Sequence, residues 1–198
     1  MENYSLLGQT FMTSYKPDVI ARCLPFSCGN DDMDDFFHYA RLYAEELLGK
    51  SYCFVTTEAP HQIVAMFTVA NDSIKTTHLG RSTTNRVNRP IDNAKRGRSY
   101  PATLIGRIGV NKEFQKKGYH VGSQVMDFLK QWFTDEENKT GCRFLVVDAY
   151  NHMNVLSYYE KNGFKFLHKT EDEEREYYHI EDSQIHTRLM YFDLKQVI

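Results

Sequence analysis

The chain has 198 residues, of which 41% are hydrophobic and 14% aromatic, and its 24 basic and 26 acidic residues give a formal net charge of −2. This composition is typical of a globular protein with a substantial core, which excludes fibrous and wholly disordered classes. The balanced charge excludes a polycation held on nucleic acid by net charge alone, although a local basic patch stays open. The length favours one domain spanning residues 1–198.

Cysteine usage and the N-terminus indicate the compartment. Cys23, Cys28, Cys53 and Cys142 form no CxxC pair and no zinc-type cluster, so we expect reduced thiols and no metal site. The N-terminus lacks the basic start and apolar run of a signal peptide. All apolar stretches fall short of the ~18 residues that a membrane span needs. These features predict a soluble cytoplasmic protein that does not insert into a membrane.

The first 50 residues predict a strand followed by a helix. Residues 4–24 are expected to hold the first strand. Asn30 then offers a capping side chain, and Gly49 ends a segment whose apolar residues recur at helical spacing. The apolar positions of this predicted helix are Met33, Phe36, Phe37, Ala40, Ala44 and Leu47.

A hairpin is expected next. Two β-rich runs, 52–57 and 62–70, are separated by Glu58-Ala-Pro-His61, which predicts antiparallel strands. Residues 72–100 lack periodicity and are expected to form a loop.

The second half predicts alternating strands and helices, and hence a mixed α/β sheet. One of its runs, Cys142 to Ala149, is continuously apolar, as in a buried parallel strand. The expected elements are a strand at 103–110, a helix at 120–134, the strand at 142–149, a helix ending at Asn162-Gly163, and strands at 164–167 and 188–194 around an acidic linker.

The passage from Leu104 to Ser123 carries the strongest chemical signal. A strand runs into a loop that contains Gly118 and Gly122 and that opens a helix. Backbone N–H groups at a helix start bind anions, and glycines let a phosphate come close. The spacing fits neither a P-loop nor a dinucleotide-binding fingerprint. Taken alone, the passage is more typical of a plain capped turn than of an anion site.

Its context resembles the GNAT acetyltransferases. Gln115-Lys-Lys-Gly118 matches the first half of their motif A, Gln/Arg-x-x-Gly-x-Gly/Ala, between a strand and a helix. Gly118-Tyr-His-Val-Gly122 follows, so either the loop is two residues longer or His120 replaces the small residue. Tyr159-Glu-Lys-Asn-Gly-Phe164 resembles the family's Tyr-x-x-x-Gly-Phe element. The likeness covers residues 52–168.

A narrower likeness lies upstream. Phe26-Ser-Cys-Gly-Asn-Asp-Asp-Met-Asp-Asp-Phe-Phe37 is similar to the start of the GNAT branch that includes toxins acetylating aminoacyl-tRNA. The resemblance implies a GNAT fold, in which a mixed sheet with two splayed parallel strands is flanked by helices, and it implies acetyl-CoA as the cofactor.

The family's functional positions map onto this chain as follows. The pantetheine arm would pair with the backbone of Ile108, Gly109 and Val110, and Asn151 or Asn154 would hydrogen-bond the cofactor or cap a helix. The residues implied around the pyrophosphate are Gln115, Lys116, Lys117, Gly118, His120, Val121, Gly122 and Ser123.

Tyr159 matches the tyrosine that protonates the departing thiolate in many GNAT enzymes. A thiol near pKa 8.5 and a phenol near pKa 10 are close enough for this transfer. A core aromatic is the structural alternative, and Tyr158 is the neighbouring candidate. The general base is unassigned, since Arg107 is the one ionisable residue in 103–110 and cannot serve; His78, His120 and Glu113 are unranked candidates.

Two charge runs bear on the acceptor. Residues 81–107 carry seven bases against one acid, and residues 171–182 carry seven acids against one base. Solvated loops are the default for both. The basic stretch would alternatively grip RNA phosphates or form a subunit contact, which leaves a homodimer open. We expect acetyl transfer to a primary amine of a small molecule or protein; the alternatives are tRNA acetylation and a CoA-binding sensor without catalysis.

Overall fold

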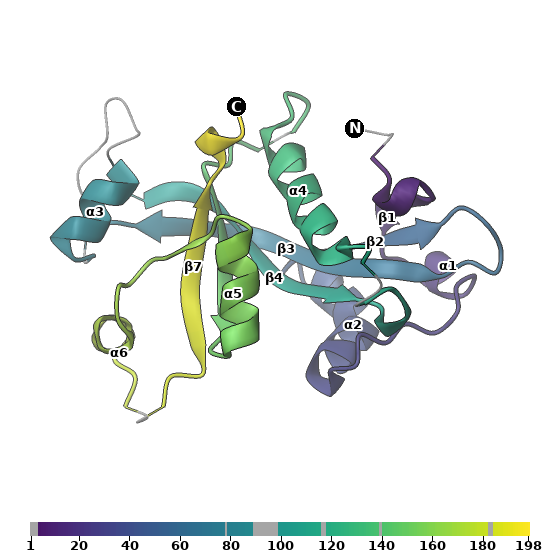
Figure 1. Ribbon diagram of the computed structural model, residues 1–198, viewed down its shortest axis with the longest axis horizontal. Helices are drawn as coiled ribbons and strands as arrows, with labels where there is room; N and C mark the ends of the chain where they lie inside the picture. The colour runs from purple at the N-terminus through teal and green to yellow at the C-terminus, as the bar shows by residue number, and fades with distance from the viewer. Residues whose placement is uncertain (1–3, 78, 89–98, 116–117, 139, 182–183) are drawn as a thin grey trace. The chain divides into compact units, whose positions relative to one another are not determined.

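The computed structural model describes residues 4–77, 79–88, 99–115, 118–138, 140–181 and 184–198. Its strands are hydrogen-bonded in the order β1-β2-β3-β4-β5-β7-β6 (Figure 1). They are β1 (Thr10–Ser14), β2 (Lys50–Thr56), β3 (Ile63–Lys75), β4 (Ser99–Val110), β5 (Phe144–Tyr150), β6 (Lys165–Phe166) and β7 (Thr187–Asp193). The mixed α/β sheet predicted from the sequence is confirmed.

The helices alternate with these strands along the chain. The α-helices are α1 (Pro17–Ile20), α2 (Asp31–Glu45), α3 (Arg81–Asn88), α4 (Val121–Thr134), α5 (Met153–Lys161) and α6 (Glu171–Tyr178), and the 3-10 turns are η1 (Leu6–Gly8), η2 (Lys112–Phe114) and η3 (Leu194–Gln196). Throughout the described ranges, none of these helices has the length and hydrophobicity needed to cross a bilayer.

The chain forms two compact units, and strands β3 and β4 contribute to both. The first unit comprises residues 1–70 and 105–138, and the second comprises residues 71–104 and 139–198.

In the first unit, an antiparallel hairpin is covered on both faces. Lys50 of β2 lies opposite Val69 of β3, which confirms the predicted hairpin, and Thr10 of β1 lies opposite Thr56 of β2. Neighbouring residues of a strand point to opposite faces. Aromatic residues of α4 therefore pack on one face and α2 on the other (Figure 1).

The two faces differ in character. On the α4 face the rings of Phe54 and Phe128 lie 5.1 Å apart in an edge-to-face arrangement, and Phe67 lies beside them. On the α2 face the aliphatic and sulfur-containing side chains of β2 and β3 surround Phe37, which is 1% exposed. Burying one such side chain contributes about 1.5–3 kcal/mol, so both helices are strongly held.

Helix α2 begins as predicted but ends differently. The Asn30 side chain accepts a hydrogen bond of 3.0 Å from the Met33 N–H, a regular N-cap. The helix ends at Glu45 in a Schellman motif, in which Leu47 N–H donates to Ala44 and Leu48 N–H donates to Tyr43. Leu47, and not Gly49, adopts the left-handed conformation, with φ of 58°. A non-glycine residue pays about 1–2 kcal/mol for this conformation.

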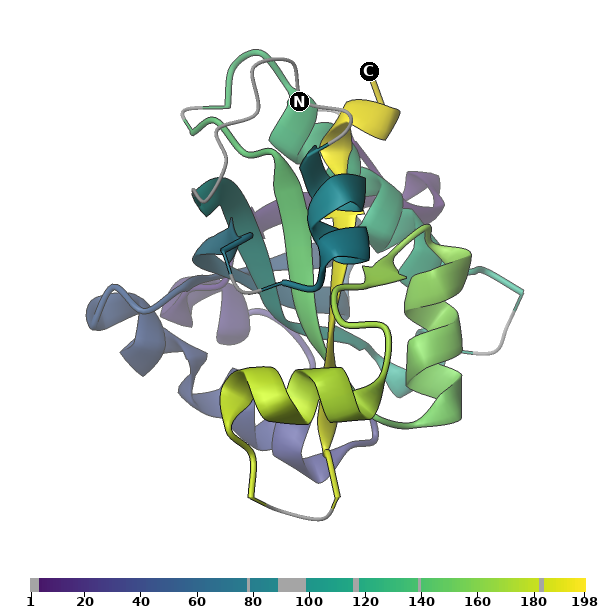
Figure 2. The same ribbon diagram turned by 90° about the vertical axis from the view of Figure 1, so that its left-hand side faces the viewer.

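In the second unit, β5 is the central strand. It pairs in parallel with β4, where Ala102 lies opposite Phe144, and antiparallel with β7, where Val146 lies opposite Tyr191. The buried parallel strand predicted at 142–149 is confirmed. Helices α3 and α6 lie on the face that carries Phe144 and Tyr191, in front of β5 and β7 in Figure 2.

Two stretches predicted as loops are helices. Thr83 and Val87 form the buried stripe of α3, which lies inside the 72–100 segment, and β3 extends into that segment as far as Lys75. A helix of two turns offers too few apolar residues to produce a visible period. The acidic linker contains α6, whose start is capped by Thr170 accepting from the Glu173 N–H. A Thr-x-x-Glu capping box was the available signal there.

One buried ion pair fastens α6 to β7. The Glu174 carboxylate, 2% exposed, accepts hydrogen bonds of 2.6 Å from Arg188 Nε and from the Leu189 N–H. The Arg188 guanidinium also donates to the His168 carbonyl at 3.1 Å and lies over the Phe166 ring. Losing one partner of such a pair leaves the other charge buried and uncompensated.

We predict that Arg188→Met destabilises the protein by about 3–5 kcal/mol, because Glu174 keeps its burial and loses its counter-charge. Arg22→Met is the control, since the Arg22–Asp18 pair is 68% exposed on both sides and should cost less than about 1 kcal/mol. Urea unfolding at pH 7 measures both values, and equal losses in the two variants would refute the assignment.

Candidate active site

The segment after β4 is held by side-chain to backbone hydrogen bonds. Asn111, 6% exposed, donates from Nδ2 to the Ile63 carbonyl at 3.0 Å and accepts from the Glu113 N–H at 3.1 Å. Its own N–H donates to the Val64 carbonyl, and the Lys112 N–H donates to Ser27. The chain therefore leaves β4 along a fixed path that begins with turn η2.

Gln115 braces this path. Its Nε2 donates to the Val110 carbonyl at 2.7 Å and to the Cys28 carbonyl at 2.8 Å. One side chain thus joins the end of β4 to the segment that leads into α2. The sequence placed Gln115 in a cofactor motif, but its side chain is engaged within the protein and its backbone N–H donates to the Lys112 carbonyl at 3.4 Å.

The loop reaches α4 through two left-handed residues. Gly118 has φ of 71°, and a Cβ at this position would meet nothing within 4 Å. His120 has φ of 50°, is exposed and is the N-cap residue of α4, yet its side chain makes no capping hydrogen bond. The first turn of α4 holds no acidic residue. Backbone N–H groups at an uncapped helix start attract anions, and the helix dipole adds to this attraction.

Gln124 fixes the loop from the helix side, a role that sequence reasoning missed. Its Nε2 donates to the Tyr119 carbonyl at 2.7 Å, and its Oε1 accepts from the Leu7 N–H at 3.2 Å. Gln124 follows the motif by two residues, and nothing in the sequence indicates its distant partner Leu7. Lys116 and Lys117 lie outside the described residues.

The strand residues predicted to face the cofactor include one tightly packed position. A Cβ on Gly109 would lie 3.0 Å from the Phe37 ring and 3.4 Å from Cys28 Cβ. Gly109 therefore permits the close approach of α2 to β4, a reason for glycine that does not involve a ligand. Ile108 and Val110 are partly buried, and the Val110 carbonyl already accepts from Gln115.

The two asparagines of the second unit have separate roles. Asn151 donates from Nδ2 to Glu171 Oε1 at 2.9 Å and to the Ile185 carbonyl at 3.0 Å. Asn154 is an exposed residue within the first turn of α5. Neither is the helix N-cap, because His152 occupies that position. The capping alternative for these asparagines is wrong, since the helix starts between them.

Tyr159 lies near the end of α5 and is 7% exposed. Its ring packs 5.4 Å from Phe164. The helix ends in a Schellman motif, in which Gly163 N–H donates to Glu160 and Phe164 N–H donates to Tyr159. Gly163 has φ of 84°, and a Cβ there would lie 3.0 Å from Phe192. Both the turn and the packing therefore require glycine, which confirms the predicted helix stop.

Among the candidate bases, the structure describes His120 and Glu113, both exposed; His78 lies outside the described residues. Arg107 stacks over the Phe36 ring at 5.0 Å and lies 3.9 Å from Asp32 of α2. Arg107 is therefore engaged with α2. Within the described ranges, no group of three His, Cys, Asp or Glu side chains is placed to hold a metal ion.

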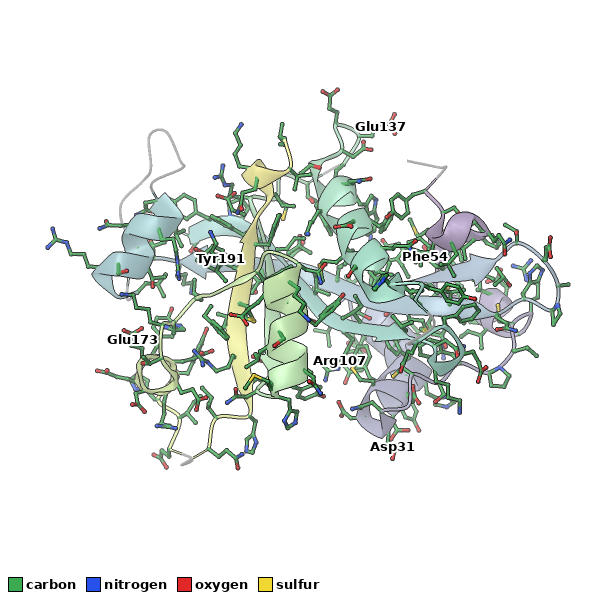
Figure 3. The ribbon with its side chains drawn as sticks, viewed as in Figure 1. Asp31, Phe54, Arg107, Glu137, Glu173 and Tyr191 are labelled. Atoms are coloured by element: carbon green, nitrogen blue, oxygen red, sulfur yellow. The ribbon has the colours of Figure 1, made fainter. Side chains whose placement is uncertain are left out.

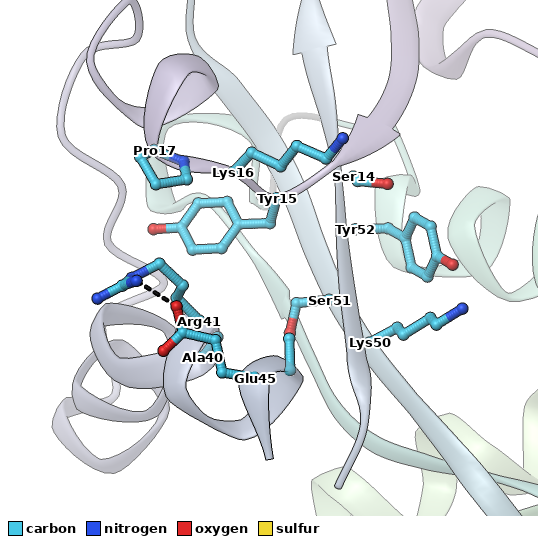
Figure 4. A pocket seen from close by; sticks show the side chains of 11 residues that line it. Ser14, Tyr15, Lys16, Pro17, Ala40, Arg41, Glu45, Lys50, Ser51 and Tyr52 are labelled. Atoms are coloured by element: carbon cyan, nitrogen blue, oxygen red, sulfur yellow. Dashed lines mark hydrogen bonds and ion pairs between the residues drawn. The ribbon is translucent and has the colours of Figure 1, made fainter. Parts of the chain in front are cut away.

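The first unit also contains a cavity of about 250 Å³ between α2 and the ends of β1 and β2 (Figure 4). Ala40, Ala44 and Ser51 belong to its lining, together with the Tyr15 side chain, and Arg41 is paired with Glu45 beside it. None of the residues predicted from the motifs lines this cavity.

Comparison with known proteins identifies the fold. No protein-family model matches the chain, and no curated protein matches it. Solved structures do match: a tyrosine-to-phenylalanine mutant of KacT is 14% identical with a TM-score of 0.64, and the alignment covers 96% of this chain and 99% of KacT. AtaT complexed with acetyl-methionyl-tRNAfMet is 16% identical with a TM-score of 0.63 over 95% of this chain and 96% of AtaT.

A third match is the AtaTR structure bound with AcCoA, which is 16% identical with a TM-score of 0.62 and covers 96% of each chain. The chain has the GNAT fold. The fold expected from the two motifs is thereby confirmed, and it extends beyond residues 52–168 to nearly the whole chain.

We predict that Gln115→Ala lowers the free energy of unfolding by about 1–3 kcal/mol, because two hydrogen bonds of about 0.5–1.5 kcal/mol each are lost. Gln131→Ala, an exposed change on α4, is the control and should stay within about 0.5 kcal/mol. Urea unfolding followed by tryptophan fluorescence checks both. An unchanged free energy of unfolding in Gln115→Ala would contradict the stabilising role assigned to these two hydrogen bonds.

Proposed function

We propose that the chain is an acetyl-CoA-dependent N-acetyltransferase that transfers acetyl directly to a primary amine. One observation carries the proposal: the segment between β4 and α4, which matches motif A, combines an uncapped helix start with a left-handed glycine that has open space beside it. The GNAT fold supports it, and AcCoA is bound in the AtaTR structure of the same fold.

The described residues of this segment fit a pyrophosphate. The N–H groups from Gly118 to Ser123 are the proposed donors, and no acid in the first turn of α4 opposes an anion. His120 takes a conformation that glycine adopts most easily. This favours the alignment in which His120 stands in place of the small residue of the motif. We also propose the backbone of Ile108, Gly109 and Val110 for the pantetheine arm, with Lys116, Lys117 and Asn154 as further contacts.

Acetyl-CoA would supply the activated acetyl thioester, and the protein would provide the groups that donate and accept protons. We propose Tyr159 as the acid that protonates the departing thiolate, because it occupies the tyrosine position of the Tyr-x-x-x-Gly-Phe element and its helix end is rigidly fixed. A phenol of pKa near 10 can give a proton to a thiolate whose thiol has pKa near 8.5 when it is positioned for the transfer. No side chain is assigned as the base for the amine.

Acetyl-CoA is predicted to stabilise the protein. At 100 times its dissociation constant a ligand adds about 2.7 kcal/mol, which raises the melting temperature measurably. Gly122→Val should reduce this shift, because a side chain would crowd the N–H groups at the start of α4. Gly141→Val is the control, since a Cβ on Gly141 meets nothing within 4 Å. The absence of any shift in the wild type would refute the cofactor site.

Tyr159→Phe is predicted to keep cofactor affinity and to lower turnover by about 10²-fold, the contribution of a positioned acid. The assay is acetyl-CoA consumption with a panel of amines, and Tyr158→Phe is the matched control. Wild-type turnover in Tyr159→Phe would make Tyr159 a packing residue. Cofactor binding without turnover in the wild type would instead favour a CoA-binding sensor.

The acceptor is proposed to be a primary amine of a small molecule or protein, in a cytoplasmic enzyme. The net charge of −2 favours this class over RNA. A specific observation supports aminoacyl-tRNA as the second candidate: AtaT, which matches over 95% of this chain, was solved with acetyl-methionyl-tRNAfMet. A homodimer stays a prediction.

Substitutions in the basic stretch at 81–107 can distinguish a tRNA acceptor from a small-molecule or protein acceptor. Arg86 donates to the Phe166 carbonyl at 2.6 Å and lies over the Tyr191 ring, so its side chain is engaged in contacts within the second unit. Arg89, Lys95, Arg96 and Arg98 lie outside the described residues.

If tRNA is the acceptor, Arg89→Gln, Arg96→Gln and Arg98→Gln together should flatten the salt dependence of tRNA binding. Each lost phosphate contact lowers the slope of log K against log salt by about 0.7–0.9. Acetylation of a small amine should be unchanged. Filter binding of charged tRNA over a range of salt concentrations tests this, and salt-independent or absent binding would exclude the tRNA acceptor.

A further inference from the structure

Helix α2 exposes an unusual amount of apolar surface near its C-terminal end. Five large side chains within ten residues are exposed: Tyr39 (54%), Leu42 (48%), Tyr43 (43%), Leu47 (88%) and Leu48 (63%). Elsewhere in the described ranges, exposed large apolar residues are scattered. Contiguous patches of this kind are typical of interaction sites, whereas single exposed residues are ordinary.

The patch forms a second apolar face of the same helix. Met33, Phe37 and Ala40 make up the buried face against β2 and β3. Phe36, Tyr39, Tyr43 and Leu47, spaced three, four and four residues apart, lie along an adjacent stripe. The rings of Phe36 and Tyr43 are 5.0 Å apart, and Arg107 of β4 stacks on Phe36. Helical spacing therefore produces two apolar faces, and one of them lies open.

The end of the helix holds its most exposed leucine in a strained conformation. Leu47 occupies the left-handed position of the Schellman motif with φ of 58°, where α5 has Gly163. Glycine would remove both the backbone strain and the exposed side chain. The free chain gains nothing from leucine at this position, which points to a role for the side chain in contact with something else.

The charges around the stripe select the partner. Residues 31–46 contain six acids and one arginine, a net charge of −5. Asp31 points away from the sheet at the start of α2 (Figure 3), and Glu45 and Glu46 lie at the other end. Arg41, the single arginine or lysine of this range, is paired with Glu45, and Arg107 of β4 lies 3.9 Å from Asp32. Asp34 is the acid turned inward, where it accepts from Ser27 and Cys28.

We propose that the open face of α2, defined by Phe36, Tyr39, Leu42, Tyr43, Leu47 and Leu48, binds a cationic amphipathic segment of another protein. The stripe from Phe36 to Leu47 is about 18 Å long, which suits a partner helix of about three turns. A second copy docked α2 to α2 would bring acids against acids, and an RNA would meet the same repulsion. A helix with lysine or arginine around an apolar stripe complements both the shape and the charge.

The test uses a fluorescein-labelled 14-residue peptide with leucine at positions i, i+3, i+4, i+7, i+8 and i+11 and lysine or arginine elsewhere. Fluorescence anisotropy should show binding to the full chain that weakens with salt. A scrambled peptide of equal composition and an analogue with glutamate for lysine should bind at least about tenfold more weakly.

Leu47→Gly provides the decisive variant. It should raise the melting temperature of the free protein, because the backbone strain is relieved, while weakening peptide binding about tenfold or more, because an apolar contact is lost. Tyr39→Ser should weaken binding likewise. Met153→Ser removes a residue that is 80% exposed in the other unit and should change nothing. The acetyl-CoA melting shift should be intact in all three, so the acetyl-transfer proposal is tested separately.

Several results would overturn the proposal. These are equal binding of the scrambled peptide, binding unaffected by Leu47→Gly and Tyr39→Ser, and the absence of peptide binding at micromolar concentrations. Concentration-dependent self-association that Leu47→Gly abolishes would assign the face to a second copy. RNA affinity that Tyr39→Ser abolishes would assign it to nucleic acid.

Discussion

The junction between β4 and the segment that leads into α2 depends on the hydrogen bonds of one side-chain amide. Gln115 donates to the carbonyls of Val110 and Cys28, which lie at the end of β4 and before α2. Through these bonds the strand, the helix and the loop that enters α4 share one fixed junction. Gly109 allows the junction to be tight, because any side chain there would press on Phe37 and Cys28. The start of the segment that leads from β4 to the proposed anion site is therefore fixed by hydrogen bonds and packing within the first unit.

Three helices end in the same turn but place different residues in its left-handed position, so the backbone strain of the turn differs between them. Schellman motifs end α2, α5 and α6 with Leu47, Gly163 and His179 in the left-handed position. At Gly163 glycine is required by both φ and the nearby Phe192 ring, and this fixes the end of the helix that carries Tyr159. At Leu47 the same turn holds an exposed leucine. Local strain is commonly retained where it serves a contact or a reaction.

Local signals in the sequence predicted much of the fold. The cap at Asn30, the hairpin, the buried strand of Val146 and the stop at Asn162-Gly163 each depend on residues close to one another in the chain. Helix α3 was missed because Thr83 and Val87 alone contact the core, and α6 because its acids concealed the Thr170 cap. Helix α3 therefore depends on tertiary packing, which a local pattern does not encode, whereas the Thr170 cap of α6 was a local signal.

The candidate site was predicted in part, for a related reason. The two motifs located the start of α4 and Tyr159, but the partners of their side chains are distant in sequence. Gln115 reaches Cys28, 87 residues away, and Asn151 reaches Glu171 and Ile185. The motifs alone therefore do not show which of their side chains form hydrogen bonds within the protein and which groups could contact a ligand. The single-domain expectation and the splaying of β4 and β5 stay predictions.

Amide hydrogen exchange by NMR, with and without saturating acetyl-CoA, tests the proposed cofactor site most directly. We predict slower exchange at the backbone N–H groups of Gly118 to Ser123, because hydrogen bonds to the pyrophosphate must open before exchange occurs. The amides of α3 and α6 should exchange at unchanged rates. Unchanged exchange from Gly118 to Ser123, with acetyl-CoA demonstrably bound, would contradict the account and place the cofactor elsewhere.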